Sequence, residues 1–451
     1  MNEPLIVAKF GGTSVADSRM VMNVSRIIAS DPRRRFIVVS APGKRTAADE
    51  KVTDLLYSHH AQRKMGVDAS TQLVTIKHRF LEMAQELKVD CMPRWLDEME
   101  AQLATNHDRD WIASRGEYLS ARLIAAYLDA EFVDAADIIR FDAAGQLLPE
   151  ETYDSASARL ALVPESRLAV IPGFYGADVN GRVRCFSRGG SDISGSIVTR
   201  AVNAIVYENW TDVSGMLMAD PRVVSDPRPI VEMTYREQRE LSYMGATVLH
   251  EEAVFPVREV GIPIHIRNSN EPDAPGTRIV TERDSTHTSI TGIAGRKGFS
   301  VISIEKAMMN RDASYGLKVL RVLEEYGVPY EHSPAAIDTF GLIVTQEQLG
   351  GQEDTLISEI TRVAKPDRID VRRDIALIGV VGQGMSRRVG VAAAIFTALT
   401  EINVNICLAN QWTSEFNVII GVAADDYEKS VRAIYDRFSG ESGGGDLDVR
   451  S

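Results

Sequence analysis

Short apolar segments alternate with longer amphipathic segments through the first part of the chain, and this alternation constrains the fold more than any other feature. The apolar segments are predicted strands at residues 5–10, 36–40, 130–134, 168–171, 204–208 and 262–266. Amphipathic helices are predicted between them, for example at residues 18–29, 67–87 and 117–128. Such alternation is typical of an α/β fold with a largely parallel sheet, in which ligands bind at the carboxyl ends of the strands.

The pattern changes after a polar, turn-rich stretch at residues 268–289. Beyond it, a strand, a helix and a further strand are predicted at residues 301–306, 315–326 and 341–345, and again at 375–381, 389–402 and 417–422. These two sets indicate a structural repeat, although their sequences share little identity. The glycine-rich run that starts at residue 439 is predicted to be a flexible tail.

Composition narrows the class of protein. The 451 residues are 44% hydrophobic and 25% charged, with a net charge of −13, which is ordinary for a globular protein and argues against a nucleic-acid-binding surface. No apolar stretch approaches the length of a membrane span. Cys91, Cys185 and Cys407 lie far apart, which favours a reducing compartment, and the histidines lack the spacing of metal ligands. We therefore expect a cytoplasmic protein with no nucleic-acid or membrane partner and no dedicated metal site.

Two glycine-centred turns are the candidate binding site. The first predicted strand runs into Lys9-Phe10-Gly11-Gly12-Thr13-Ser14, and a second turn lies at residues 187–192. Paired glycines let backbone N–H groups approach an anion closely, while the lysine and the hydroxyl groups add charge and donors, so the first turn suits a polyphosphate. Neither turn has the spacing of the common nucleotide-binding motifs. For the first turn taken alone, an ordinary structural turn is the alternative.

Together with several other motifs, these turns resemble the aspartokinase family. The matching stretches are residues 9–14, 115–120, 173–174, 188–192, 210–213, 219–222 and 245–250. The resemblance covers nearly the whole chain. It implies an amino-acid-kinase fold, an α/β arrangement with a parallel-rich sheet sandwiched by helices, followed by two α+β ACT modules of βαββαβ-like order. The implied boundaries are 1–285 for the catalytic domain, 286–370 and 371–438 for the two ACT-like modules, and 439–451 for the tail.

Members of this family transfer the γ-phosphoryl group of ATP to the side-chain carboxylate of L-aspartate, the first step toward lysine, threonine and methionine. Such chemistry needs positioning and charge neutralisation, because a carboxylate is already a nucleophile. The resemblance implies that Lys9 neutralises the transferred group and that the amides of Gly11 and Gly12 cradle its oxygens. It assigns Asp192 to organising that lysine and Mg²⁺, which is expected with ATP. A helix cap is the alternative role of Asp192.

For the amino-acid substrate, the resemblance points to Arg188 as the partner of a carboxylate and to Glu117 as the partner of the ammonium group. Ser40, Thr53 and Ser191 match positions that line the same pocket. Considered alone, Glu117 would be interpreted as an acid at the start of a solvated helix.

For the nucleotide, the family pattern adds Thr13, Ser14, Thr211, Asp212, Leu217 and Arg222 to the residues of the first turn. Thr211-Asp212 could also be a plain turn. The sequence departs from well-known members at two positions, because Leu217 stands where they have a tyrosine and Thr247 stands where they have a lysine. An apolar side chain can still cover a base, but a threonine cannot replace a cation.

In the C-terminal half, two segments resemble the effector-binding segments of lysine-sensitive relatives. The implied effector residues are Met309, Asn310, Tyr315, Gly316, Ser333 and Asp338, with Glu331 as a further candidate for binding a cation. Lysine is the favoured effector, although Ala335 and Ala336 replace the serine and glycine that those relatives often have. Unpaired strand edges in the modules favour a homodimer or a dimer of dimers.

Two other classes of function share part of this pattern. A sister kinase acting on another carboxylate or on a nucleotide would share the glycine turns but would not be expected to have Arg115-Gly116-Glu117 together with the tandem repeat. A non-catalytic amino-acid sensor would lose Lys9, Arg188 or Asp192, and all three are present. The length leaves no room for a downstream homoserine dehydrogenase domain, so a monofunctional kinase is expected.

Overall fold

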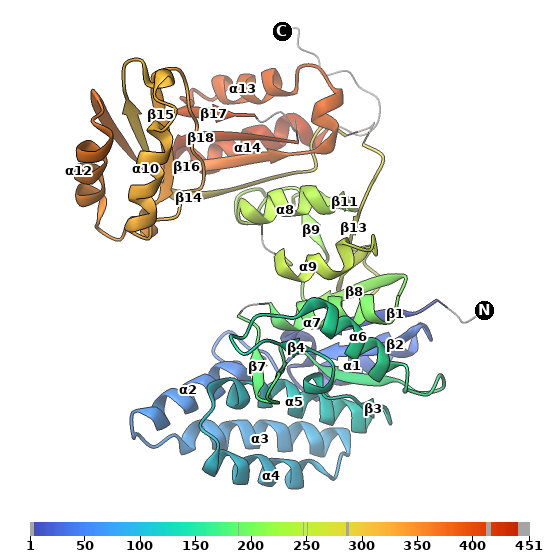
Figure 1. Cartoon of the computed structure of the whole chain (residues 1–451). Coiled ribbons are helices and arrows are strands. Elements are labelled where there is room, and N and C mark those ends of the chain that lie inside the picture. Colours follow the sequence, from blue (N-terminus) through green and yellow to red (C-terminus); the bar gives the residue numbers. More distant parts are fainter. Residues whose placement is uncertain are drawn as a thin grey trace. The chain divides into compact units, whose positions relative to one another are not determined.

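The computed structural model describes residues 4–440, apart from residues 188, 247, 250, 286–287 and 412–415. Its contacts divide the chain into two compact units (Figure 1). The first unit contains the chain up to Met216, Pro229–Gln238 and residues 248–283, and the second contains Leu217–Arg228, residues 239–247 and the chain from Asp284 onward. The second unit thus includes two segments that lie inside the range expected for the catalytic domain.

The first unit is built on an eight-stranded sheet in the order β11-β13-β12-β8-β1-β2-β5-β3. Its strands are β1 (Ile6–Phe10), β2 (Arg34–Val39), β3 (Glu131–Phe132), β5 (Ala169–Pro172), β8 (Val206–Thr211), β11 (Glu232–Thr234), β12 (Ile264–Asn268) and β13 (Thr277–Val280). Every neighbouring pair is parallel except β12 and β13. All six strands predicted in this part of the chain are present, and the predicted parallel-rich sheet is confirmed.

Helices cover both faces of this sheet (Figure 1). One group comprises α1 (Ser18–Ala29), α2 (Val52–Lys64), α3 (Ser70–Leu87), α4 (Met92–Thr105) and α5 (Arg109–Tyr127), and the opposite group includes α6 (Pro149–Leu160), α7 (Gly190–Ala201) and α9 (Glu251–Arg258). Residues alternate between these faces along β1, because Ala8 and Phe10 join the core beneath α1–α5. The intervening Lys9 therefore points to the face of α7, whose first turn it contacts.

Helix α5 begins earlier than the sequence predicted. The side chain of Asp108 accepts hydrogen bonds from the backbone N–H groups of Asp110 and Trp111, which is the usual way an aspartate starts a helix. Glu117 consequently lies in the middle of α5 and is only 4% exposed. The alternative interpretation of Glu117, as an acid at a solvated helix start, is wrong.

Shorter elements complete the first unit and its connections. They are the 3₁₀ turns η1 (Gly12–Val15) and η2 (Ala135–Asp137), a small sheet of β4 (Arg140–Phe141), β6 (Tyr175–Asp178) and β7 (Val183–Cys185), the pair β9 (Met216–Leu217) and β10 (Pro229–Ile230), and α8 (Tyr235–Tyr243). Turn η1 follows β1 directly, so the first glycine turn is one tight turn at the end of a parallel strand.

The second unit has one five-stranded antiparallel sheet in the order β15-β14-β16-β18-β17. Its strands are β14 (Gly292–Glu305), β15 (Thr339–Thr345), β16 (Arg368–Val381), β17 (Leu408–Asn410) and β18 (Asn417–Ala423). Both predicted strand-helix-strand repeats are present. They share this sheet, because β14 and β16 have 14 residues each and pair along almost their full length. The expected boundary between the two modules, at residues 370 and 371, falls inside β16.

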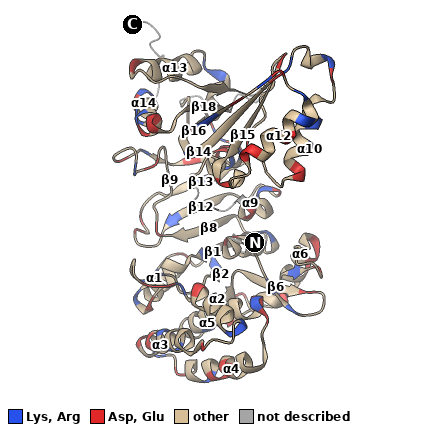
Figure 2. Cartoon of the chain, turned by 90° about the vertical axis from the view of Figure 1, so that its left-hand side faces the viewer, with Lys and Arg blue, Asp and Glu red and all other residues tan. Residues whose placement is uncertain are grey.

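Helices and 3₁₀ turns accompany this sheet. They are η3 (Met309–Arg311), α10 (Tyr315–Glu325), α11 (Gln346–Leu349), α12 (Glu353–Ala364), η4 (Gln383–Arg387), α13 (Val391–Glu401), η5 (Ala424–Asp426) and α14 (Tyr427–Ser439). Figure 2 shows residues of both charge signs on α10 and α12. Their apolar residues, such as Val319, Leu323 and Ile360, pack into the core of the first repeat. The predicted tail lies outside the described residues from 441 onward.

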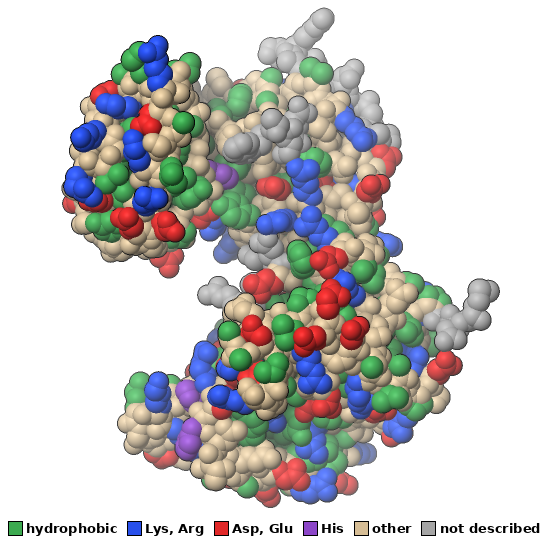
Figure 3. Space-filling view, viewed as in Figure 1, with side chains coloured by type: hydrophobic (Ala, Val, Ile, Leu, Met, Phe, Trp, Pro, Cys, Tyr) green, Lys and Arg blue, Asp and Glu red, His purple; other side chains and the backbone are tan. Residues whose placement is uncertain are grey.

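The described residues show no charged patch of a single sign on the face in Figure 3, no membrane-spanning helix and no disulfide. Acidic, basic and hydrophobic side chains are interspersed on the face in Figure 3. No helix of the described residues has the length and apolar character needed to cross a membrane. The three cysteines are free thiols.

Candidate active site

A buried ion pair stands at the carboxyl end of the parallel sheet. Lys9 Nζ lies 2.5 Å from Asp192 Oδ1, and the two side chains are 8% and 17% exposed. Asn209 Nδ2 donates to the same carboxylate oxygen over 2.9 Å. Oδ2 of Asp192 has no hydrogen-bond partner among the described residues. The structure thus brings both predicted catalytic residues together and leaves a carboxylate oxygen available. The helix-cap alternative receives no support, since this side chain is directed to Lys9 and Asn209.

The glycine turn beside this ion pair is held from two sides. Gly11 N–H donates to Trp210 O at the end of β8 over 2.9 Å, and Gly43 N–H donates to Gly12 O over 2.8 Å. A Cβ atom on Gly43 would lie 2.6 Å from the carbonyl carbon of Gly12, so only glycine permits this approach. Ser14 is buried and its hydroxyl lies 2.8 Å from that of Ser269. Thr13 is exposed at the same turn.

The second turn starts α7. Gly189 has a φ of +60°, which favours glycine, and a Cβ atom on Gly173 would lie 2.6 Å from Cβ of Ser191. Gly173 therefore allows the first turn of α7 to lie close to the end of β5. This approach places Ser191 and Asp192 at the carboxyl edge of the sheet, where N–H groups of a helix start favour anions. Arg188 lies outside the described residues, so its predicted role in binding the substrate carboxylate stays a prediction.

Glu117 enters the same edge from α5. A Cβ atom on Gly116 would lie 2.8 Å from Cβ of Ala41, which shows how closely α5 approaches the segment after β2. Burial raises the pKa of Glu117 to about 8, against weaker opposing effects of the Ala41 backbone and the Thr53 side chain. Its Oε2 atom has no hydrogen-bond partner among the described residues.

Two other predicted substrate residues lie beside Glu117. Ser40 follows β2 and its N–H donates to Phe10 O over 3.1 Å, while Thr53 is the second residue of α2. Glu117 interacts with the Thr53 side chain and with the backbone of Ala41, the residue after Ser40, so three of the five predicted substrate residues lie close together. A buried carboxyl group with a spare oxygen is suited to receive a cation such as an ammonium group.

The predicted nucleotide residues fall in both units. Thr211 is the last residue of β8 and Asp212 follows it in the first unit, where Ser269 N–H donates to Thr211 O over 2.8 Å. In the second unit, Leu217 is half-buried in β9, and Arg222 makes bidentate contacts with Asp220 and is 88% exposed. Thr247 lies outside the described residues, so the consequence of this departure from the family pattern stays a prediction.

Sequence reasoning missed three residues that shape this edge: Asn209, Gly43 and Ser269. Asn209 is paired with Lys9 in the β1–β8 register, which puts the two side chains on the same face. The Pro42-Gly43 turn after a predicted strand was a signal for Gly43. The contact of Ser269 with Ser14 spans 255 residues of sequence and had no local signal.

The predicted effector residues lie together in the second unit. Asp338 Oδ1 accepts from Met308 N–H over 2.8 Å, and Lys306 N–H donates to Asp338 O, so the segments around residues 309 and 333 meet. Met309 and Tyr315 are buried, and the Tyr315 hydroxyl has no partner among the described residues. Gly316 faces the ring of Phe340, Asn310 is exposed and Ser333 is half-buried. The candidate Glu331 lies 3.4 Å from Arg296.

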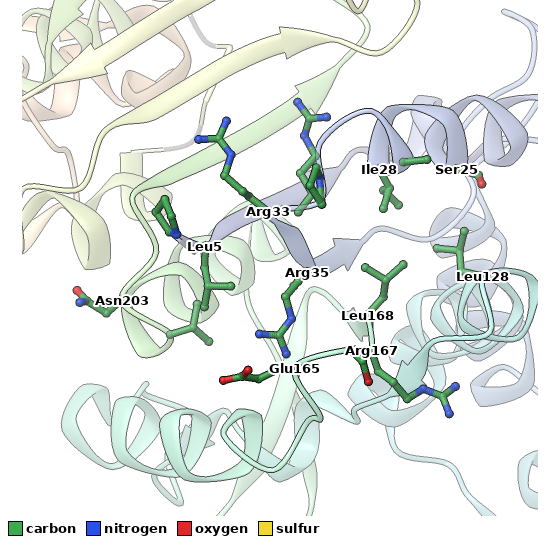
Figure 4. A pocket seen from close by; sticks show the side chains of 16 residues that line it. Leu5, Ser25, Ile28, Arg33, Arg35, Leu128, Glu165, Arg167, Leu168 and Asn203 are labelled. Atoms are coloured by element: carbon green, nitrogen blue, oxygen red, sulfur yellow. The ribbon is translucent and has the colours of Figure 1, made fainter. Parts of the chain in front are cut away.

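Two larger hollows occur in the first unit. One, of about 870 Å³, lies where strands β1, β2 and β5 begin, opposite the edge described above (Figure 4). Its arginines are engaged: Arg35 donates to Pro164 O and Arg167 to Asp129 O. The other, of about 1060 Å³, includes Cys185, Ser187 and Ile193 and so borders the start of α7. Among the described residues, none of those predicted to bind the substrate lines this second hollow, which reaches the candidate site only at the start of α7.

Comparison with known proteins identifies the chain's family. A sequence model of the amino acid kinase family matches residues 4–268, and a model of the ACT domain matches residues 378–438. The chain is 38% identical to aspartokinase 3 of Bacillus subtilis over 450 residues, which cover 96% of this chain and 98% of that protein. The chain belongs to the aspartokinase family.

Solved structures agree with this membership. The crystal structure of aspartate kinase from Clostridium acetobutylicum matches with a TM-score of 0.89 at 46% identity, covering 96% of this chain and all of that one. Escherichia coli aspartokinase III in complex with aspartate and ADP shares the fold, with a TM-score of 0.74 at 24% identity, over 96% of this chain and 99% of that one. The protein is thus an enzyme, an aspartate kinase that uses ATP, with an amino-acid-kinase domain followed by ACT structure.

Proposed function

We propose that this aspartate kinase binds Mg²⁺·ATP and L-aspartate at the carboxyl ends of β1, β2, β5 and β8. There it transfers the γ-phosphoryl group to the side-chain carboxylate and forms 4-phospho-L-aspartate, the first step toward lysine, threonine and methionine. The observation that carries the proposal is the contact of Lys9 with Asp192, buried beside the glycine turn. A fixed cation next to free backbone N–H groups is what a transferred phosphoryl group requires.

Each side of the site has its own task in this proposal. Lys9 and the amide of Gly12 stabilise the phosphoryl group, whereas the predicted role of the Gly11 amide is not supported, because that N–H group donates to Trp210 O. Thr13, Ser14, Thr211 and Asp212 hold the nucleotide. Glu117 binds the ammonium group of aspartate, and Arg188, Ser40, Thr53 and Ser191 position its carboxylates. The unpartnered Oε2 of Glu117 supports the assignment, because a buried lone carboxylate gains most from an incoming cation.

The donor set fits a magnesium ion that arrives with ATP. Among the described residues no cluster of three or more metal-ligating side chains occurs, so a cage made by protein alone is not available. Mg²⁺ usually binds through one or two carboxylates plus phosphate oxygens, and Oδ2 of Asp192 is free to serve as such a ligand. Bound there, the ion would neutralise charge on the phosphates.

Regulation by free lysine is part of the proposal. The meeting of the two effector segments at Asp338 supports it, as does the 26% identity over 449 residues with a protein named lysine-sensitive aspartokinase 3 of Escherichia coli. Outer strands β15 and β17 offer edges for pairing, which supports a homodimer or a dimer of dimers. The free cysteines support the cytoplasm as the place of the reaction.

The decisive experiment measures ADP formation from Mg²⁺·ATP with L-aspartate, with L-glutamate and without an acceptor, each with and without L-lysine or L-threonine. We expect turnover that depends on aspartate, requires Mg²⁺ and is suppressed by lysine. Aspartate-dependent turnover that neither lysine nor threonine changes would support the kinase reaction and contradict the proposed regulation by lysine. Absence of aspartate-dependent turnover in the folded protein would overturn the proposed reaction.

A further inference from the structure

Arg79 is a charged side chain in an unusual place. It belongs to α3, whose other buried residues are mostly apolar, and it is only 3% exposed. Its guanidinium points to loops at the carboxyl edge of the sheet instead of to water. Burial lowers its pKa from the ordinary value, because removal from water disfavours the charged form. Such a position is costly and calls for compensation by specific contacts.

The contacts of Arg79 join three loop positions. Nη2 donates to Ala16 O over 2.9 Å and also to Gly43 O, and Nη1 donates to Glu50 O over 3.0 Å. Asp49 Oδ2 lies 3.6 Å from Nη1. Ala16 directly follows η1, the first glycine turn. One guanidinium therefore connects the end of the first glycine turn to both ends of the loop at residues 43–50. We call this turn the phosphate turn below.

This loop in turn fixes the glycine turn. The N–H group of Gly43 donates to Gly12 O over 2.8 Å. A peptide unit is planar, so holding the carbonyl of Gly12 also fixes the direction of the N–H group of Thr13 in the same unit. A Cβ atom on Gly12 would lie 3.0 Å from Ala41 O, so the turn is packed directly against the segment that Arg79 anchors.

We propose that Arg79 is a positioning residue for the phosphate turn. It acts through Gly43 and Ala16, and its role is to hold the backbone N–H groups of Gly12 and Thr13 in the geometry that ATP needs. The inference rests on the proposed function, because it assigns the nucleotide phosphates to this turn. Lysine cannot substitute, since one ammonium group lacks the planar fork that reaches three carbonyl oxygens at once.

The test compares Arg79→Lys with Arg34→Lys in the full-length protein. Arg34 is a matched control because it is 4% exposed and its hydrogen bonds go to Ile27 O, Ser30 and Glu208, none of which belongs to the glycine turn or to the loop at residues 43–50. We expect both variants to melt at a lower temperature than the parent. We expect Arg79→Lys alone to weaken ATP binding about tenfold and to lower kcat about tenfold, whereas Arg34→Lys keeps both values within about threefold.

ATP affinity is measured by calorimetry without aspartate, so that failure of the proposed reaction can be told apart from failure of this inference. Added guanidinium ion at low millimolar concentration should restore part of the activity of Arg79→Gly and none in Arg34→Gly. Unchanged ATP affinity in a folded Arg79→Lys protein would overturn the proposal. Should that variant not fold, Asp49→Asn decides, because loss of the acid beside Nη1 should weaken ATP binding about threefold and an unchanged affinity would refute the role.

Discussion

Glu117 and Glu208 are two glutamates of the same domain, equally buried at 4% and 3% exposure, with opposite titration behaviour. Burial raises the pKa of both carboxyl groups. In Glu208 the hydrogen bonds and charges of Arg34, Trp210 and Arg267 outweigh burial, so its pKa lies below the ordinary value. In Glu117 burial prevails and raises the pKa to about 8. The difference shows that an incomplete set of partners, and not burial, distinguishes the site from the scaffold.

The same contrast holds between two buried ion pairs, Arg34–Glu208 and Lys9–Asp192. Glu208 accepts from Arg34 Nε at 2.7 Å and from Trp210 Nε1 at 2.9 Å, and Arg267 lies 3.3 Å away, so its carboxylate is surrounded. Asp192 uses one oxygen for Lys9 and Asn209 and keeps the other available. Neighbouring positions 208 and 209 of β8 thus lie on opposite faces, one in the structural core and one at the proposed active site.

Replacing Lys9 should give the largest effect. We expect Lys9→Met to lower kcat about 1000-fold, because it removes a preorganised cation from the transferred phosphoryl group. The melting temperature should change little, since Asp192 can rotate toward solvent at a partly open site. Steady-state kinetics and thermal melts check this. A variant that keeps more than a tenth of parental kcat would contradict the catalytic assignment.

The two glutamates can be exchanged for glutamine in parallel. Glu117→Gln should raise the KM for aspartate about 30-fold through loss of a charged partner for the ammonium group, with melting temperature kept or raised. Glu208→Gln should cost about 3 kcal/mol of folding free energy, because it leaves buried arginines uncompensated, with the KM for aspartate unchanged. An unchanged KM for aspartate in Glu117→Gln, or a raised KM in Glu208→Gln, would contradict the assignment of Glu117 to the substrate site and of Glu208 to the structural core.

The pH dependence should separate the same pair. The folded pKa of Glu117, about 8, exceeds the ordinary value of 4.5, so the folded protein binds an extra proton between these values. Its contribution to stability is therefore present below about pH 4.5 and lost as the pH rises to about 8. Glu208 has the opposite sign, because its folded pKa is depressed and its stabilisation is lost as the pH falls.

Kinetics give the matching readout. Because ionised Glu117 is needed for the ammonium group, kcat/KM for aspartate should rise about fivefold from pH 7 to pH 8, where the pKa of Glu117 lies, and level off above about pH 9. The rise should vanish in Glu117→Gln and persist in Glu208→Gln. A profile that is flat in the parent enzyme would argue against Glu117 as the ammonium partner.

A smaller effect is expected at the glycine contact. Gly43→Ala should raise the KM for ATP about tenfold, since its Cβ atom would collide with the backbone of Gly12. Gly440→Ala is the control, because Gly440 has a φ of −78° and no atom lies within 4 Å of its Cβ position. Equal kinetics for both variants would show that the turn adapts without cost to nucleotide binding.

The smallest effect should arise in the second unit. Asp338→Asn should raise the lysine concentration for half-inhibition about fivefold and leave the uninhibited kcat unchanged, because it removes a negative charge that would bind the lysine cation while the asparagine amide oxygen can still accept from Met308 N–H. Inhibition curves at fixed aspartate measure it. Asp374→Asn, at an exposed position on β16, is the control. Identical curves would remove Asp338 from the effector site.

Much of this arrangement followed from the sequence. Apolar periodicity predicted the six strands, and the resemblance to aspartokinases implied that Asp192 accompanies Lys9, which the structure places beside it. The full length of α5 was missed, because the cap at Asp108 precedes the apolar pattern, and so was the buried place of Glu117. Contacts such as Ser14 with Ser269 or Arg79 with Gly43 depend on tertiary packing of distant loops. No local periodicity encodes them.

The shared sheet of the second unit restricts how such a protein can be rearranged. Strands β14 and β16 run side by side through both repeats, so a recombination joint between the repeats would sever two long strands and expose their edges. An exchange of effector preference with a relative would therefore have to transfer the whole sheet as one block. Although the two repeats are consecutive in the sequence, we expect them to be exchanged between proteins only together, because they share one sheet.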